Sequence, residues 1–398
     1  MRGLSTMLAV LPGTAGLERP SRMPDRGLLV TAFTILLFGL VMVASASVAI
    51  AQHQTGNSLY YFYKQGAFAV VGCGLGAAVF MVPMATWRRL SFLLLGASLL
   101  VLVVVLVPGI GHSVNGARRW LDLGPFQVQV SEPARLALLV YLAGYVVRRG
   151  ERVRTQLGGL IVPMVPIGLA GLLMLAEPDF GGTAILLAVS LIMMFVAGAR
   201  LRYFVLLIVL AAAALAFLAV SSPYRMERLV SFLNPWADPY SSGFQLVQSL
   251  IAVGRGHVFG VGLGNSVQKL LYLPEAQTDF LFAVIAEEFG LAGTTLVLAL
   301  FSFLLWRGFV IAGRALAAGQ TFGAYLAYAL TAWLGLQAFI NVAVNMGLLP
   351  TKGLTLPLMS YGGSSLLVMC SVIAMLARVD YEAQAASGGQ PPQVRARA

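Results

Sequence analysis

Residues 222–290 read SPYRMERLVSFLNPWADPYSSGFQLVQSLIAVGRGHVFGVGLGNSVQKLLYLPEAQTDFLFAVIAEEFG, and the rest of the chain is organised around this stretch. It is the only long polar interruption in a mostly hydrophobic chain. It runs directly into an apolar helix that carries Asp279, Glu287 and Glu288. A carboxylate at the mouth of a membrane helix costs free energy to keep, so its presence indicates a functional site.

The composition of the whole chain indicates a membrane protein. Of 398 residues, 59% are hydrophobic and only 10% are charged, and the mean hydropathy is +0.86. Soluble globular proteins carry about 25% charged residues, so a soluble class is excluded. In a soluble domain, a net charge of +11 would favour binding of nucleic acid. In a membrane protein, Arg and Lys residues instead concentrate in the loops on one side of the membrane, so no nucleic acid is expected. Cys73 and Cys370 lie in apolar runs and predict no disulfide framework.

Apolar runs long enough to cross about 30 Å of hydrocarbon recur along the chain. They lie near residues 28–50, 60–83, 88–108, 132–148, 158–176, 181–199, 202–221, 278–306, 321–348 and 356–378. The sequence therefore predicts an all-α polytopic membrane protein with about ten transmembrane helices. Its expected parts are an N-terminal tail at 1–27, a transmembrane domain at 28–380 with a long extracytoplasmic loop at 222–277 between helices seven and eight, and a C-terminal tail at 381–398.

An even number of spans puts both termini on one side, and the Arg and Lys bias of the loops puts that side in the cytoplasm. Most of the 26 cations fall there. The remaining, outward cations are Lys64, Arg118, Arg119, Arg135, Arg225, Arg228, Arg255, Lys269 and Lys352. Because outward cations oppose the usual bias, the set indicates an anionic ligand on that face. For any single one, a lipid phosphate or a local salt bridge is an equal alternative.

The first outer segment is GHSVNGARRWLDLGPFQVQVSEPARL, residues 111–136, which joins the third and fourth expected helices. Arg118 and Arg119 beside Trp120 suit an anionic ligand with an apolar or sugar face. The alternative is a tryptophan anchor at the membrane interface. Glu132 and Arg135 lie three residues apart at the start of a helix, share a face, and are expected to form a salt bridge with each other.

The second outer segment is LAEPDFGG, residues 175–182. Glu177 and Asp179 flank a proline in a tight turn, and we expect them to cap the helix that follows, whose N-terminal dipole favours acids. Metal binding is the alternative, but further ligands are lacking nearby. The three histidines show no zinc-ligand spacing.

The long loop at 222–277 far exceeds the usual connection length, so it should hold structure of its own. LVSFL (229–233) and FQLVQSLIAV (244–253) have helical apolar spacing, which predicts amphipathic helices on the membrane surface. The glycine-rich GRGHVFGVGLG (254–264) forms neither standard phosphate-binding motif, so an NTPase is unsupported.

The fourth outer segment is NMGLLPTKGLTLPLMSYGGSS, residues 345–365. It brings Lys352 to the outer surface and opens the last helix with small residues. Ser360, Gly362 and Gly363 permit close packing of helices or close approach of a ligand to the backbone.

These segments resemble the SEDS family of polytopic glycosyltransferases. Residues 341–365, NVAVNMGLLPTKGLTLPLMSYGGSS, are similar to the whole family signature. Further matches are GARRWLDLG (116–124), EPDFG (177–181), NPWADPYSSGFQLVQS (234–249) and LPEAQTDFLFAVIAEEFG (273–290), so the resemblance spans nearly all of the membrane region. GNSVQKLLYLPEA (264–276) and the cytoplasmic tail resemble the cell-division branch more than the elongation branch. Two positions depart from the family. Gln277 stands where the family usually has His. In the family's PSE-type motif a Pro comes before the Glu, whereas in this chain Pro133 comes after Glu132.

The resemblance implies a peptidoglycan glycosyltransferase that polymerises lipid II, a disaccharide-pentapeptide on undecaprenyl pyrophosphate. The resemblance implies that polymerisation takes place at the outer face of the bacterial cytoplasmic membrane, at the division septum. Asp279 matches the family's TDF aspartate and is the expected base for the acceptor hydroxyl in one inverting displacement. Glu287 and Glu288 lie too far along the helix to form a dyad with it and are expected to be structural. The pyrophosphate is expected to meet cations from Arg118, Arg119, Arg135, Lys269 and Lys352.

A class B penicillin-binding transpeptidase and other membrane proteins of the division machinery are implied as partners. Two alternatives stay open, a lipid II flippase and a non-catalytic division scaffold. A flippase predicts inverted repeats and charges on a path to the inner side, whereas the polar segments gather outside. No cofactor is predicted, and a divalent cation, magnesium or manganese, stays an open alternative without a site in the sequence.

Overall fold

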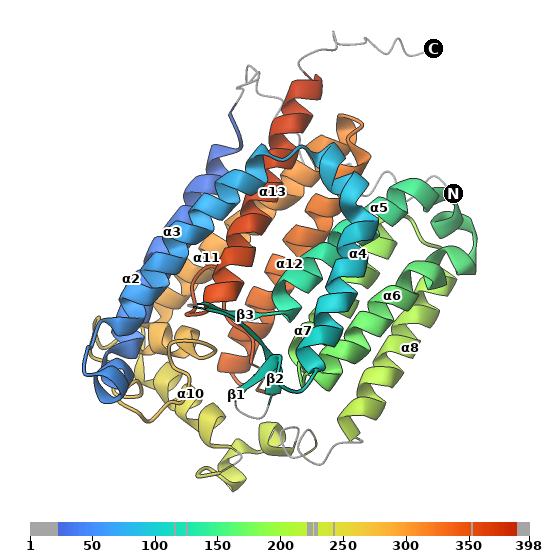
Figure 1. Cartoon of the computed structure of the whole chain (residues 1–398). Helices are drawn as coiled ribbons and strands as arrows, with labels where there is room; N and C mark the ends of the chain where they lie inside the picture. Colours follow the sequence, from blue (N-terminus) through green and yellow to red (C-terminus); the bar gives the residue numbers. More distant parts are fainter. Residues whose placement is uncertain are drawn as a thin grey trace.

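The computed structural model describes residues 23–114, 117–124, 126–220, 226, 230–241, 243–351 and 353–387. Long helices form the body of the molecule (Figure 1). They are α2 (Arg26–Thr55), α3 (Tyr60–Met81), α4 (Met84–Leu106), α5 (Ser131–Thr155), α6 (Leu157–Ala176), α7 (Phe180–Val196), α8 (Leu201–Val220), α11 (Leu281–Ala317), α12 (Thr321–Asn345) and α13 (Gly363–Ser387). Each of the expected spans corresponds to one of these helices.

Seven of the described helices are long and apolar enough to cross a membrane. α7 and the first part of α8 are shorter apolar helices. α5 is less hydrophobic because Glu132 and Arg135 lie in its first turns and four arginines lie near its end. A charged pair inside a helix bundle is tolerated where the two charges meet each other, so α5 fits the same architecture. The chain is therefore a multi-pass membrane protein.

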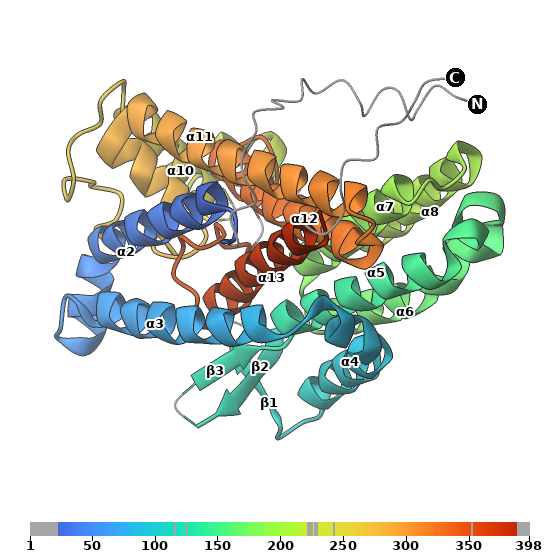
Figure 2. The ribbon, with the colours of Figure 1, turned by 90° about the horizontal axis from the view of Figure 1, so that it is seen from above.

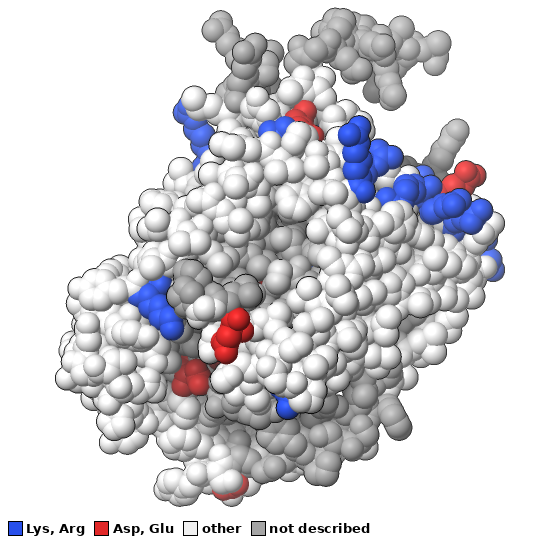
Figure 3. All heavy atoms as spheres, in the orientation of Figure 1, with Lys and Arg blue, Asp and Glu red and all other residues white. Residues whose placement is uncertain are grey.

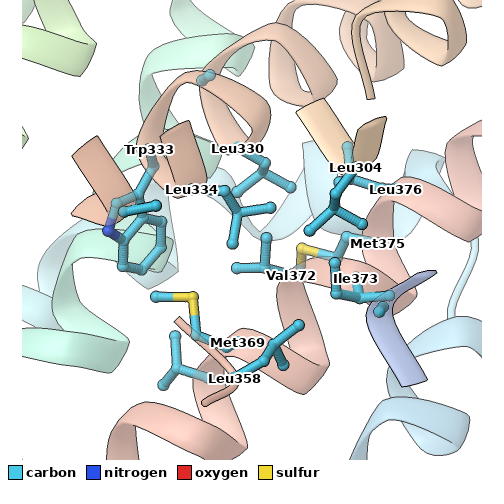
Figure 4. Close-up of a cluster of buried hydrophobic side chains, with 14 of the residues drawn as sticks. Leu304, Leu330, Trp333, Leu334, Leu358, Met369, Val372, Ile373, Met375 and Leu376 are labelled. Atoms are coloured by element: carbon cyan, nitrogen blue, oxygen red, sulfur yellow. The ribbon is translucent and has the colours of Figure 1, made fainter. Parts of the chain in front are cut away.

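α12 and α13 form the centre of the bundle. In each of them 72% of the most apolar window is buried within the protein, against 22% for α4. Trp333 and Leu334 of α12 pack with Met369 and Val372 of α13 and with Leu358 of the preceding loop (Figure 4). A helix that is hydrophobic all round and buried all round belongs to the core, so the other helices meet lipid around these two.

Two helix boundaries differ from the expectation. α11 begins at Leu281 rather than 278, so Asp279 lies in the turn before the helix. α13 begins at Gly363 rather than 356, because Leu358 has a φ of +64°, which lies outside the right-handed helical region. It then continues to Ser387, past the start of the tail expected at 381.

The outer segment between α4 and α5 contains a small sheet that the sequence did not predict within the helical fold. It is antiparallel and consists of β1 (Gly111–Val114), β2 (Ala117–Leu123) and β3 (Phe126–Gln129) in the order β1-β2-β3. Figure 2 shows this sheet lying beside α3 and α4. The strands are too short for alternation of polar and apolar residues to identify them, and the turn residues between them gave only a loop signal.

The long loop contains the expected surface helix α10 (Phe244–Arg255). Leu246, Val247 and Ala252 on its apolar face are buried, and α10 packs mainly against α11. A short 3₁₀ turn, η1 (Pro235–Ala237), precedes it. Of the other expected helix, LVSFL, residues 230–233 are helical, and residue 229 lies outside the described part of the chain.

α11 is interrupted at Gly290, where φ is 62° and ψ is −154°. The interruption removes helical partners from nearby backbone groups, and the glycine-rich segment after α10 replaces them. Val261 and Gly262 donate their amides to the carbonyls of Glu287 and Glu288, both at 3.0 Å. The amides just after the break donate to the carbonyls of residues 257 and 258, also at 3.0 Å. Non-helical backbone at membrane depth is tolerated where protein buries and satisfies it in this way.

The glycines of this segment permit the close approach. A Cβ atom on Gly256 would lie 1.8 Å from the Ala286 carbonyl oxygen, and one on Gly260 would lie 2.1 Å from the Glu288 carbonyl oxygen. Gly260 also has a φ of +80°, which favours glycine. The glycine-rich stretch that matched no phosphate motif is therefore a packing segment against the broken α11.

Candidate active site

A cavity of about 1180 Å³ lies at the end of the bundle where α3, α5, α7, α11 and α13 begin. Residues from all four expected outer segments line it, although those segments are far apart in the sequence. The predicted site residues in its lining are Arg119, Trp120, Glu132, Arg135, Asp179, Asp279, Gly362 and Gly363. Tertiary packing thus brings most of the candidates into one space.

Asp279 lies in the turn before α11 and lines this cavity. Its backbone carbonyl accepts hydrogen bonds from the side-chain amides of Asn341 (2.8 Å) and Asn345 (2.9 Å) of α12. Asn345 also accepts a bond from the Ala283 amide at 3.0 Å, which ties the first turn of α11 to α12. The loop before α13 comes close, since a Cβ on Gly353 would lie 3.3 Å from an Asp279 carboxylate oxygen. The carboxylate therefore faces the cavity from a backbone fixed by the buried core.

Asn341 and Asn345 were not predicted as site residues from the sequence. Asn341 donates a further bond to the Leu354 carbonyl at 2.6 Å and so joins the Asp279 turn to the loop before α13. The available signal was their spacing: two amides one turn apart in the otherwise apolar α12 share a face.

The predicted salt bridge between Glu132 and Arg135 is confirmed, with 2.5 Å between a carboxylate oxygen and a guanidinium nitrogen. Arg135 also lies over the Trp333 ring, 5.1 Å from its centroid, and donates to the Ser131 carbonyl at 3.3 Å. Both charged side chains are buried, so the pair neutralises charge that would be costly alone. The cavity wall on α5 is accordingly rigid.

The predicted capping is confirmed for Asp179 and wrong for Glu177. The Asp179 carboxylate accepts a 2.9 Å bond from the Gly182 amide at the start of α7. Glu177 lies fully buried at the end of α6, and neither of its carboxyl oxygens has a hydrogen-bond partner among the described residues. Burial raises the pKa of the Glu177 carboxyl to about 8; the charge of Asp179 adds to this effect and Arg119 opposes it. Glu177 therefore holds its proton at neutral pH.

The neighbouring arginines on β2 have different surroundings. Arg119 and Trp120 line the cavity. The Arg119 Nε and the Trp120 indole N–H are buried without hydrogen-bond partners in the described part of the chain. Arg118 instead donates to the Leu106 carbonyl at the end of α4, at 3.3 Å, and does not line the cavity. The expectation that Arg118 meets the ligand is therefore not supported by its placement.

Lys269 and Glu288 also lie away from the cavity. The Lys269 ammonium is 2.6 Å from a Glu288 carboxylate oxygen and 2.8 Å from the Ser45 hydroxyl of α2. Ser45 donates to the same carboxylate at 2.7 Å. All three groups are buried, so the expectation of a pyrophosphate contact for Lys269 is corrected: its charge neutralises Glu288. The expected structural role of Glu288 agrees with this geometry.

Glu287 anchors the long loop in a comparable way. Its carboxylate accepts bonds from the Ser266 hydroxyl (2.5 Å) and from the amides of Val267 (3.0 Å) and Gln268 (3.3 Å). The two adjacent glutamates of α11 therefore hold the segment that leads to Asp279.

Ser360, a further candidate, does not line the cavity. The Ser360 hydroxyl accepts a 2.9 Å bond from the Leu356 amide and stabilises the turn before α13. Lys352 lies outside the described residues. Gln277, where the family usually has His, is buried, and its carbonyl accepts a 2.9 Å bond from the Tyr361 amide.

Lys64 of α3 lines the cavity and was not predicted as a site residue. Its ammonium lies over the Tyr60 ring, 5.7 Å from the centroid, and no carboxylate of the described residues pairs with it. The sequence signal was a lysine at the outer end of an apolar helix. No group of three or more His, Cys, Asp or Glu side chains is placed to hold a metal ion within the ranges that the structure describes.

Fold and cavity together define a multi-pass membrane protein with a polar, enzyme-like site at one end of its helix bundle. The chain belongs to the FtsW/RodA/SpoVE family of cell cycle proteins, whose family model matches residues 26–385. The resemblance drawn from the sequence is thereby confirmed.

Relatives and solved structures agree with this assignment. A relative from Thioalkalivibrio sulfidiphilus, named probable peptidoglycan glycosyltransferase FtsW, is 55% identical over 358 residues, which cover 90% of each chain. A protein of the same name from Legionella pneumophila is 50% identical and covers 94% of this chain and 95% of its own. A chain from a structure described as "Structural coordination of polymerization and crosslinking by a peptidoglycan synthase complex" is 30% identical with a TM-score of 0.74, covering 90% of this chain and 98% of its own. The rod shape determining protein RodA of Thermus thermophilus is 28% identical with a TM-score of 0.66, covering 90% and 96%.

Proposed function

We propose that this protein is a peptidoglycan glycosyltransferase that polymerises lipid II during septal wall synthesis. The observation that carries the proposal is the cavity in which Asp279 shares a lining with Arg119, Arg135 and Lys64. A base and several cations in one space suit the transfer of a sugar away from a diphosphate. The names of the close relatives support the same chemistry.

The proposed reaction is one displacement. The Asp279 carboxylate takes the proton of the acceptor hydroxyl. At the same time, the oxygen of that hydroxyl bonds to the anomeric carbon of the donor. The bond from that carbon to the diphosphate breaks, and the electron pair leaves with the polyprenyl diphosphate. The anomeric configuration inverts from α to β, which needs a single base and no covalent enzyme intermediate.

The leaving diphosphate is proposed to bind the cavity cations. Arg119 has a buried Nε–H without a partner in the described residues, which favours an incoming anion because a buried unpaired donor is costly. Lys64 lines the cavity with an exposed side chain, so its charge can attract an anion there. Arg135 is engaged by Glu132 through one guanidinium nitrogen, but its buried Nη1 has no partner in the described residues, so it offers the diphosphate a donor as well. Lys352 stays a proposed contact. A divalent cation, magnesium or manganese, would act on the diphosphate.

The proposed location is the bacterial cytoplasmic membrane at the division septum, with the cavity facing outward and both tails in the cytoplasm. Lys and Arg side chains gather at the upper right of the face in Figure 3, over the C-terminal end of α5 and away from the cavity. This distribution favours a cytoplasmic location for that end. A class B penicillin-binding transpeptidase and other division proteins are the proposed partners, supported by the likeness to a chain of a peptidoglycan synthase complex.

The test uses purified full-length protein in vesicles, with and without its transpeptidase partner, and labelled lipid II. Asp279→Asn should lower glycan synthesis about a thousandfold, since it removes the base. Asp122→Asn is the matched control, because Asp122 lines the same cavity from β2 and is half exposed. Undiminished polymer from Asp279→Asn would sink the proposal. Transbilayer movement of labelled lipid II without polymer would instead identify a flippase, and a wild-type protein with neither activity would be a scaffold.

A further inference from the structure

One wall of the cavity is lined mainly by aromatic rings, with Lys64 as the cation of α3 among them. Tyr61 and Phe68 of α3 and Tyr361 of the turn before α13 all line it. The rings of Tyr61 and Tyr361 meet edge to face, with centroids 5.0 Å apart and planes at 83°. Arg119 and Arg135, in contrast, come from β2 and α5 and form a different wall. The cavity is therefore divided by chemistry.

The turn that carries Tyr361 is held in place on both sides by one side chain. Gln65 of α3 is fully buried. Its amide nitrogen donates to the Ser360 carbonyl at 3.0 Å, and its amide oxygen accepts from the Gly362 amide at 3.3 Å. A Cβ on Gly363 would lie 2.4 Å from the Phe68 ring, so this glycine lets the turn approach α3. The backbone of the turn that carries Tyr361 is thus fixed by the fold before any ligand binds.

The same turn is tied to the proposed base. The Tyr361 amide donates to the Gln277 carbonyl at 2.9 Å, and Gln277 lies two residues before Asp279. A group resting on the Tyr61 and Tyr361 rings consequently lies beside the turn that presents the Asp279 carboxylate.

The two tyrosines are not membrane anchors. Tyr60 and Tyr63, on other faces of α3, are 39% and 60% exposed and fit that role. Tyr61 and Tyr361 are partly buried and face the cavity, and the Tyr61 hydroxyl donates to the Gln54 side chain at 2.5 Å. An aromatic face with a polar tip suits a ligand that has an apolar face and hydroxyl edges.

We propose that Tyr61 and Tyr361 form a saccharide subsite that stacks against the pyranose ring of the acceptor. This subsite rests on the proposed transfer of a sugar. The donor sugar carries the diphosphate and must lie by Arg119 and Arg135 of the other wall. The acceptor sugar must place its hydroxyl within hydrogen-bond reach of the base. The aromatic wall coupled to the Asp279 turn meets this second requirement.

The test measures binding separately from catalysis. The probe is the soluble disaccharide of N-acetylglucosamine and N-acetylmuramic acid, without lipid or diphosphate, added to full-length protein in nanodiscs. Tyr361→Leu and Tyr61→Leu should each weaken binding about tenfold, because the stacked ring is lost. Tyr361→Phe keeps the ring and should stay within about twofold. Tyr63→Leu, on the same helix outside the cavity lining, should bind as the wild type does.

Tyr61 and Tyr361 lie on different elements, so a folding defect in one variant leaves the other informative, and melting temperatures identify such a defect. Disaccharide binding by both Leu variants equal to that of the wild type would overturn the subsite. Because binding is also measured on the Asp279→Asn background, loss of polymerisation alone does not affect this result. A wild-type protein that binds the disaccharide in a tyrosine-dependent way but makes no polymer would contradict the proposed function and not the subsite.

Discussion

At the residue scale, the positions of the cations decide which of them meet a ligand. Lys64 and Lys269 look alike in the sequence, as single lysines among apolar and polar neighbours near the outer face. Lys64 lines the cavity without a carboxylate partner in the described chain, whereas Lys269 is buried against Glu288. A buried ammonium requires a partner of opposite charge. Because Glu288 supplies that partner, Lys269 has a structural role and is not a ligand contact.

Glu177 gives a prediction about pH at the same scale. Burial, followed by the charge of Asp179, raises its pKa to about 8 from an ordinary value of 4.5. The folded protein thus holds a proton that the unfolded chain releases above its ordinary pKa, and stability falls as pH rises from about 4.5 to about 8. Glu177→Gln, which carries no charge, should remove this part of the decline and make the variant relatively more stable than the wild type at pH 8 to 9. Melting temperatures between pH 5 and pH 9 measure the effect.

Asp179→Asn is the comparison variant, because it weakens the capping bond to Gly182 and removes a charge that adds to the raised pKa of Glu177. It should be less stable than the wild type and should narrow the pH-dependent decline from its upper end, whereas Glu177→Gln removes the decline. Parallel pH profiles for the wild type and Glu177→Gln would show that Glu177 is charged in the folded protein and would contradict the inferred protonation.

At the element scale, α11 shows how a membrane helix can be broken without loss of hydrogen bonds. The break at Gly290 exposes carbonyls and amides that residues 257–262 then pair with. Glu287 and Glu288, just before the break, hold the same loop through their side chains. The element that presents Asp279 is therefore a composite of helix and loop.

Gly260→Ala tests this composite. Its Cβ would lie 2.1 Å from the Glu288 carbonyl oxygen, at a φ of +80°, so both overlap and backbone strain oppose it. The free energy of unfolding should fall by roughly 3 kcal/mol, as overpacking and a left-handed conformation each cost about 1–2 kcal/mol. Chemical denaturation in detergent micelles is the measurement.

Gly254→Ala is the control for Gly260→Ala, because Gly254 lies in α10 with nothing within 4 Å of an added Cβ. It should leave stability unchanged or raise it by about 0.5–1 kcal/mol. Equal stability of both alanine variants would mean that the glycine segment does not pack closely on α11.

At the scale of the whole molecule, one buried ion pair joins distant parts of the chain. Ser45 of α2, Lys269 of the long loop and Glu288 of α11 meet in the interior. Lys269→Met leaves the Glu288 charge unpaired and should cost about 3–5 kcal/mol of unfolding free energy, whereas Lys269→Met with Glu288→Gln should recover most of it. A double-mutant cycle on unfolding free energies measures the coupling.

Lys64→Met is the matched control for Lys269→Met, since the same change at the cavity should lower glycan synthesis and leave stability within about 0.5 kcal/mol. If the doubly substituted protein is as stable as the wild type but as inactive as Lys64→Met, Lys269 contacts the pyrophosphate after all. That result would restore the expectation drawn from the sequence.

The sequence determined the membrane class, the number of long helices, the surface helix α10, the pairing of Glu132 with Arg135 and the candidacy of Asp279. Hydropathy and residue spacing account for the first four of these features, because each depends on local contacts along one helix or on helix length against the bilayer. The role of Asp279 came instead from the resemblance to the family. The sheet was missed, since its strands are held by pairing across turns and are too short for a local pattern.

Which polar residues share the cavity, and which are buried elsewhere, depends on the packing of distant segments. The cavity joins segments that are nearly three hundred residues apart, from Lys64 to Gly363. Lys269 and Arg118 were assigned to the ligand because charge and side of the membrane are visible in a sequence, whereas the partner of a charge is not. The free energy of a buried charge depends on what lies within a few ångströms of it, and in this protein those neighbours come from distant parts of the chain.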